Sequence, residues 1–113
     1  MMKHFLAASA VSTLVLAGFA FGQAAGDPQK GKVLFEGKAE PACATCHNAN
    51  NTEKKMGPGL KGVSHKAKLN NGKKVSDATL KETILKGGGG MPAYEDTLKS
   101  ADIANLIAYL KTL

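Results

Sequence analysis

The 113-residue chain contains no tryptophan, no arginine and only two cysteines, and aromatic residues make up 5% of it. With so few large apolar side chains, a small domain buries little core, so we expect a covalent or cofactor staple to stabilise it. The absence of arginine argues against nucleic-acid binding, because the usual bidentate contacts to phosphate and guanine are missing.

Lysine therefore supplies all of the positive side-chain charge. The 15 lysines outnumber the 9 acidic residues, which gives a formal net charge of +6 with neutral histidines. A positive surface favours solubility, and it would also attract acidic partner proteins. We expect protein partners of that kind rather than nucleic acid.

The N-terminal segment predicts export. A short basic start precedes an almost wholly apolar stretch over residues 5–21, and small residues then allow cleavage after Gly22 or after Ala24. An uncleaved membrane anchor is the alternative, since the apolar stretch is near the lower limit for a span. We expect residues 1–24 to be a cleaved secretory signal peptide. Residues 25–113 would then form one domain in the periplasm, without stable membrane insertion.

One helix is predicted at the start of the domain and a second one after its centre. Asp27-Pro28 is a typical helix start, and the helix should run to about Glu36 and stop at Gly37. A second helix is expected from Ala78 to Lys86 after a cap at Ser76 or Asp77. Residues 48–75 are rich in Asn, Gly and Lys and are expected to be mainly loop, with a short helical turn around residues 60–68.

The last helix has the clearest pattern. It should begin at a cap, Ser100, and run to about Lys111. Apolar residues recur along it with helical spacing at Ile103, Leu106, Ile107 and Leu110. No segment alternates with period two, so we expect an all-α domain.

The two cysteines lie in the pentapeptide Cys43-Ala-Thr-Cys46-His47. C-x-x-C-H is typical of covalent haem attachment, in which the two thiols add across the haem vinyl groups. The adjoining imidazole would bind the iron as its proximal ligand. We therefore expect one haem c per chain, attached through Cys43 and Cys46 and ligated by His47.

The same residues suit three other kinds of site less well. A thioredoxin-type pair would follow a strand, and none is predicted before Cys43. A zinc site needs four ligands, which Cys43, Cys46, His47 and His65 would supply, but a second pair at zinc-finger spacing is missing. A disulfide between Cys43 and Cys46 would close a very small loop and stabilise little.

Met91 is the best candidate for the sixth iron ligand. It lies between the glycine tract 87–90 and Pro92, and glycine lets the backbone pass close to a flat haem. A thioether is a soft donor that raises the reduction potential. A methionine that fills a gap in the core is the alternative. Of the competing ligands, Met56 is interpreted as loop packing and His65 as a solvated surface residue.

Together these features resemble the class I, mitochondrial-type cytochromes c, especially small bacterial members with one haem. The resemblance runs from Gly31 to the C-terminus. It implies an all-α cytochrome c fold, with three to five helices packed around one covalently bound haem. It also implies that the first and last helices cross at Gly31, with Phe35, Leu106 and Tyr109 packed around the crossing.

In that family a Gly-Pro-x-Leu turn follows the haem motif, and here it is Gly57-Pro58-Gly59-Leu60. The resemblance implies that the Pro58 carbonyl accepts the second N–H of His47 and that Leu60 packs on the proximal haem face. It likewise implies Met91 as the distal ligand. The Lys- and Asn-rich loop over residues 65–74 departs from the family pattern.

The expected function is one-electron transfer between redox partner proteins, with His47 and Met91 bound to the iron in both oxidation states. Such a protein is a carrier without catalytic residues, and not an enzyme. It would be a monomer or, alternatively, the electron-accepting subunit of a periplasmic dehydrogenase. A haem protein with an open distal site for small ligands is a further alternative, although no distal acid–base histidine or arginine is evident.

Overall fold

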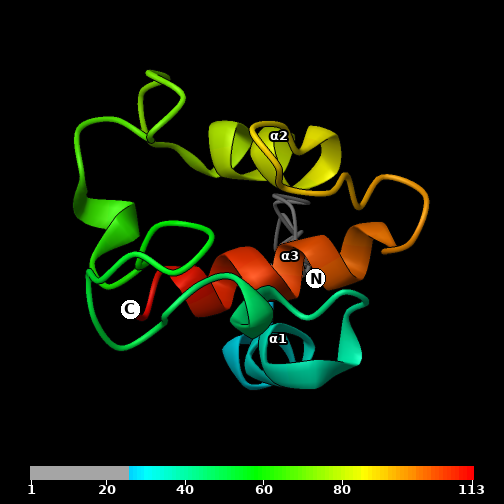
Figure 1. Cartoon of the computed structure of the whole chain (residues 1–113). Helices are drawn as coiled ribbons and strands as arrows, with labels where there is room; N and C mark the ends of the chain where they lie inside the picture. Colours follow the sequence, from blue (N-terminus) through cyan, green and yellow to red (C-terminus); the bar gives the residue numbers. More distant parts are fainter. Residues whose placement is uncertain (1–25) are drawn as a thin grey trace, which may run out of the picture.

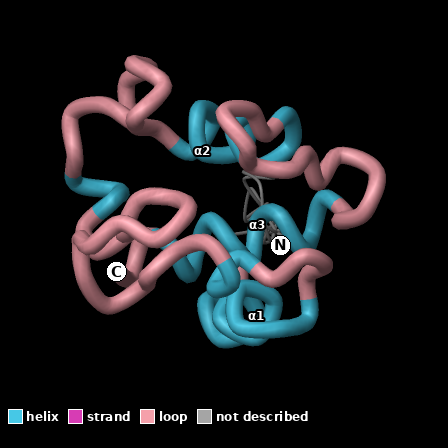
Figure 2. Tube along the Cα trace, in the orientation of Figure 1, coloured by secondary structure: helices cyan, strands magenta, loops and turns pink. Residues whose placement is uncertain are grey.

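The computed structural model describes residues 26–113, and the expected signal peptide, residues 1–24, lies outside them. The described residues form three α-helices, three short helical turns and no β-strand (Figure 2). Two isolated antiparallel bridges, Lys68 with Lys74 and Gly88 with Met91, are their only β-type pairings. The all-α fold class is therefore as expected.

The first helix, α1, spans Pro28–Val33. The Asp27 carboxylate caps it by accepting the backbone N–H of Gln29 at 2.8 Å, and Pro28 occupies the first helical position. The chain then continues as a π-helical turn, η1, over Leu34–Lys38. The expected stop at Gly37 is therefore wrong.

The π-helical turn changes which side chains reach the core. The Ala39 N–H donates to the Leu34 carbonyl at 3.1 Å, five residues back, so each residue of the turn advances by a smaller angle than in an α-helix. Leu34, Phe35 and Ala39 are buried as a result, whereas Val33 is 57% exposed. Val33, an apolar residue that the sequence places beside Leu34 and Phe35, thus lies outside the buried face.

Helices α1 and α3 pack against each other (Figure 1). Gly31 lies at their crossing, next to Asn105 and Tyr109, as the resemblance implies. A Cβ atom at this position would overlap the backbone carbonyl of Asn105, so only glycine permits the close approach. Beside the crossing, the rings of Phe35 and Tyr109 lie with centroids 5.4 Å apart at an angle of 58°. The Asn105 side chain also accepts the Asp27 N–H at 2.8 Å, which ties the two helices together.

The second helix, α2, spans Asp77–Lys86 and is capped by Ser76, whose hydroxyl accepts the Thr79 N–H at 3.1 Å. Its Leu80 and Ile84 side chains are buried. The short turn expected near residues 60–68 is present as η3, a 3₁₀-helix at Val63–His65.

The last helix, α3, spans Ser100–Leu110 and carries the expected apolar stripe. Ser100 is its first helical residue and not its cap. The cap position belongs to Lys99, whose backbone N–H donates to the Asp102 carboxylate at 3.1 Å. Ile103 and Leu106 are 1% and 2% exposed, and they form the centre of the core. No helix within residues 26–113 is long and apolar enough to cross a membrane.

Candidate haem site

A cavity of about 700 Å³ opens between α2, α3 and the loops that connect the helices. Much of its wall is apolar, formed by Phe35, Leu60, Val63, Leu80, Ile84, Leu106 and Leu110. The site residues predicted from the sequence line this one cavity: Cys43, Cys46, His47, Pro58, Leu60 and Met91. A cavity of this size and character suits a large, flat, mainly apolar group.

A single tight turn brings the C-x-x-C-H residues together. Cys43–Thr45 form the 3₁₀-helix η2, and the Cys43 carbonyl accepts the N–H groups of Cys46 at 3.1 Å and of His47 at 2.9 Å. Both thiols are free and partly buried. Burial raises the pKa of the Cys43 thiol, whereas a redox-active C-x-x-C needs a lowered one. The raised pKa of Cys43 and the absence of a strand among residues 26–113 both argue against a thioredoxin-type site.

His47 is oriented by its neighbours. Its Nδ1 atom lies 2.8 Å from the Pro58 carbonyl oxygen, the contact that the resemblance implies. A carbonyl only accepts, so Nδ1 carries the proton, and Nε2 keeps its lone pair for a metal ion. The Gly57 N–H donates to the Cys46 carbonyl at 2.8 Å, which anchors the turn beside the haem motif.

Gly57 lies directly against the His47 ring. A Cβ atom at position 57 would lie 2.5 Å from Cε1 and 2.8 Å from Nδ1 of that ring, distances that real side chains do not adopt. The turn therefore needs glycine here to reach the imidazole. Sequence reasoning identified the turn but missed this reason, because the contact joins two segments that only the folded chain brings together.

Met91 lies at the end of a tight turn formed by the glycine tract. Gly88 and Met91 exchange backbone hydrogen bonds at 2.9 and 3.1 Å. All four glycines of the tract have positive φ angles, from 62° to 120°. The Met91 side chain is partly buried and packs against the hydrophobic core.

Tyr94 holds the segment after Met91 in place from two sides. Its backbone N–H donates to the Ile84 carbonyl of α2 at 3.1 Å, and its hydroxyl donates to the carbonyl of Pro41, just before the haem motif. Burial raises the pKa of Tyr94 to about 12, with smaller contributions from Cys43 and Cys46. The segment that carries Met91 is thus tied to the segment that carries Cys43, a link that the sequence pattern did not reveal.

The competing ligand candidates lie differently. Met56 is 74% exposed at the rim of the cavity, so its interpretation as loop packing is wrong. His65 is exposed, as expected. Within residues 26–113, no three His, Cys, Asp or Glu side chains gather in a way that could hold a metal ion. The alternative of a four-ligand zinc site is therefore not supported within residues 26–113.

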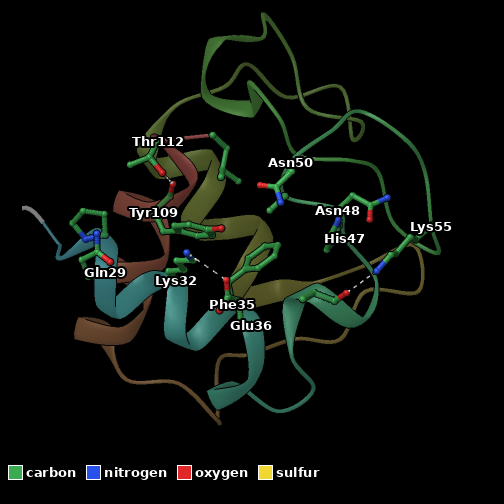
Figure 3. A pocket seen from close by; sticks show the side chains of 14 residues that line it. Gln29, Lys32, Phe35, Glu36, His47, Asn48, Asn50, Lys55, Tyr109 and Thr112 are labelled. Carbon is green, nitrogen blue, oxygen red and sulfur yellow. Dashed lines mark hydrogen bonds and ion pairs between the residues drawn. The ribbon is translucent and has the colours of Figure 1, made fainter.

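His47 also lines a second cavity, of about 590 Å³, between α1, the C-terminus and the loop after the haem motif (Figure 3). Lys55 donates to the Ala44 carbonyl at 3.1 Å at one side of it, and Lys32 lies 3.9 Å from Glu36 at another. Neither cysteine lines this space, and Met91 does not line it either. It therefore offers no covalent attachment point and only one of the two expected iron ligands.

The donor set of the first cavity fits haem. Two thiols on one turn, an imidazole with its Nδ1 proton engaged and a partly buried thioether line an apolar space. Thiols, imidazole and thioether are the groups by which proteins hold c-type haem. Cys43 and Cys46 would attach the group, and His47 and Met91 would ligate its iron.

The chain is similar in sequence to known cytochromes. Residues 26–110 match the protein-family model described as cytochrome c oxidase, cbb3-type, subunit III. The chain is also 32% identical to a cytochrome c6 from Picosynechococcus sp., over 96% of this chain and 92% of that protein. The chain thus belongs to the small class I c-type cytochromes, which are electron-transfer proteins that contain haem c.

Proposed function

We propose that this chain is a periplasmic carrier that holds one covalently attached haem and passes single electrons between protein partners. The observation that carries the proposal is that Cys43, Cys46, His47 and Met91 line one mainly apolar cavity. Haem bound there supplies a reversible one-electron change between ferric and ferrous iron.

The protein's own groups favour this use of the site. His47 presents Nε2 because Pro58 engages Nδ1, and Met91 offers a second protein ligand. Two permanent protein ligands leave no open coordination position, which suits electron transfer better than small-molecule binding. Apolar side chains around the cavity exclude water and thereby help to set the potential.

Denaturing electrophoresis followed by haem staining tests the covalent attachment. The wild-type band should stain, and the C43S/C46S double variant should lose the stain entirely. Carbon monoxide binding to the reduced protein then tests the distal ligand. Rapid and complete binding at neutral pH would favour the alternative of an open distal site, whereas a colourless wild-type preparation would overturn the proposal.

Export and partner choice are parts of the same proposal. Export depends on residues 1–24, and the N-terminal sequence of the periplasmic protein should begin at Gln23 or Ala25. Acidic redox partners are supported by the excess of lysine over acidic residues in the exported protein, 14 against 9 in residues 25–113. Electron transfer to such a partner should slow as salt is raised, because salt screens the attraction. A salt-independent rate would speak against acidic partners.

A further inference from the structure

The Lys- and Asn-rich loop that departs from the family pattern is an ordered hairpin. Lys68 pairs with Lys74 in an antiparallel bridge, and the Leu69 N–H donates to the Lys73 carbonyl at 2.9 Å. The Val75 N–H donates to the Ala67 carbonyl at 3.2 Å and extends the pairing. We name residues 66–75 the lysine hairpin.

Helix α2 anchors the lysine hairpin beside the haem cavity. Lys73 forms an ion pair with Glu82 at 2.6 Å, and the Asn71 amide donates to the Thr83 hydroxyl at 3.2 Å. Leu69 is partly buried and packs against the core. The hairpin therefore forms part of the cavity wall.

The charged lining of the cavity has one sign. No acidic residue among residues 26–113 lines the cavity, whereas three lysines do: Lys54, Lys66 and Lys68. Lys66 and Lys68 have no ion-pair partner within residues 26–113, in contrast to Lys73. Two uncompensated cations on one edge of an apolar cavity fit a ligand with anionic groups on one edge.

Haem has this distribution of charge, since its two propionate carboxylates lie on the edge of the macrocycle opposite the vinyl groups. Cys43 and Cys46 would fix the vinyl edge. Lys54 belongs to that side, because its neighbour Lys55 donates to the Ala44 carbonyl at 3.1 Å. The lysine hairpin lies well apart from the turn at Cys43–Thr45 (Figure 1). Given haem in the proposed site, we propose that Lys66 and Lys68 pair with the propionate carboxylates.

This pairing gives the lysine hairpin a role that its sequence did not suggest. Lys66 and Lys68 neutralise the carboxylates and favour one orientation of the group, while Lys73 holds the hairpin on α2. Asn70 also lines the cavity and adds an amide donor at the same edge. Lys74, the bridge partner of Lys68, does not line the cavity and so serves as a control of equal charge on the same hairpin.

Resonance Raman spectroscopy of the holoprotein tests the pairing through the bending mode of the haem propionates. K66Q/K68Q should shift this mode from its wild-type position, whereas K74Q should leave it in place. A potentiometric titration against pH provides a second readout. Loss of the cations should lower the acid dissociation constant of the propionate on the order of tenfold, because a nearby cation favours the ionised form.

Two other titratable side chains line the same cavity, Lys54 and Tyr94, and both are unchanged in the wild type, K66Q/K68Q and K74Q. In the holoprotein Cys43 and Cys46 would be thioethers and His47 an iron ligand, and all three are likewise unchanged. An unshifted mode and an unchanged propionate titration in K66Q/K68Q would overturn the pairing, as would equal shifts in K74Q. Either outcome counts against the pairing only if the variant still stains for haem and keeps its visible absorption bands. A preparation without bound haem would instead contradict the proposed function, so the two failures are distinguishable.

Discussion

The Nδ1 atom of His47 and the carbonyl oxygen of Pro58 lie 2.8 Å apart, although eleven positions separate the two residues in the chain. The hydrogen bond fixes which imidazole nitrogen is free, and it makes the imidazole a better electron donor to iron. It depends on the turn that begins at Gly57, which packs directly on the ring. The proximal side of the haem site is therefore built from two segments that must meet closely.

Replacing Gly57 with Ala should separate His47 from Pro58. The added Cβ would lie 2.5 Å from Cε1 of the ring, so the turn or the imidazole must move. Such overpacking costs about 1–3 kcal/mol of the free energy of unfolding. Denaturant titration followed at the haem band measures this loss.

Gly37→Ala is the matched control for that substitution. A Cβ at Gly37 meets nothing within 4 Å, so the free energy of unfolding should stay the same or rise slightly. If Gly57→Ala were as stable as Gly37→Ala, with unchanged visible bands, the close packing on His47 would be contradicted.

Gly31→Ala should weaken the crossing of α1 and α3. Its Cβ would overlap the backbone carbonyl of Asn105, and backbone atoms yield less readily than a flexible side chain. We expect a loss of about 3 kcal/mol, at the upper end of overpacking costs. Thermal unfolding would show this as a drop of roughly 4–8 °C for each kcal/mol. A melting temperature within a degree or so of wild type would speak against the crossing.

Met91→Ala should lower the reduction potential and leave the haem covalently attached. Loss of the thioether removes a soft donor that favours ferrous iron. We expect a decrease on the order of 0.1–0.3 V, within the range of about 0.8 V that axial ligands set. Potentiometric titration of the purified variant gives the value directly.

Met56→Ala controls for the loss of a methionine at the same cavity. Met56 is 74% exposed, and its removal should change the potential little. If the reduction potential fell strongly in Met56→Ala and stayed at the wild-type value in Met91→Ala, Met56 would be the distal ligand and Met91 would not.

Tyr94→Phe should change how stability depends on alkaline pH. Burial raises the pKa of Tyr94 from 10 to about 12, so between these values the unfolded chain loses this proton and the folded protein keeps it. Stability of the wild type therefore falls as pH rises from 10 to 12. The variant lacks this titration, and it should be less stable by about 1 kcal/mol at neutral pH because the bond to Pro41 is lost.

The difference in the free energy of unfolding between the two proteins should then shrink and change sign as pH rises from 10 to 12, because the wild type loses roughly 2 kcal/mol over that interval. Denaturant titrations at several pH values measure it, with the other tyrosine, Tyr109, present in both proteins. A constant difference from neutral pH to pH 12 would contradict the buried, hydrogen-bonded state of the Tyr94 hydroxyl.

Local sequence patterns predict those parts of the fold that depend on neighbouring residues. The apolar stripe of α3 is buried as expected, because helical spacing places Ile103 and Leu106 on one side. The ends of the helices are harder to predict. The π-helical turn after Val33 and the cap at Lys99 depend on particular hydrogen bonds, which residue type alone does not determine.

The candidate site shows the same division. The spacing of C-x-x-C-H is a local signal, and Met91 is recognisable from its glycine and proline neighbours. The contacts of Gly57 with His47, and of Tyr94 with Pro41, join distant segments and carry no local pattern. The placement of Lys66 and Lys68 at the cavity also has no local sequence signal, because lysine-rich loops usually lie in solvent.

A redox titration followed by visible absorption tests the central claim most directly. We expect one reversible one-electron transition between two spectra, each typical of haem c with two protein ligands, and no change of ligand between the two states. A protein without haem absorption would contradict the account, as would a titration in which reduction releases Met91 and opens the iron to added ligands.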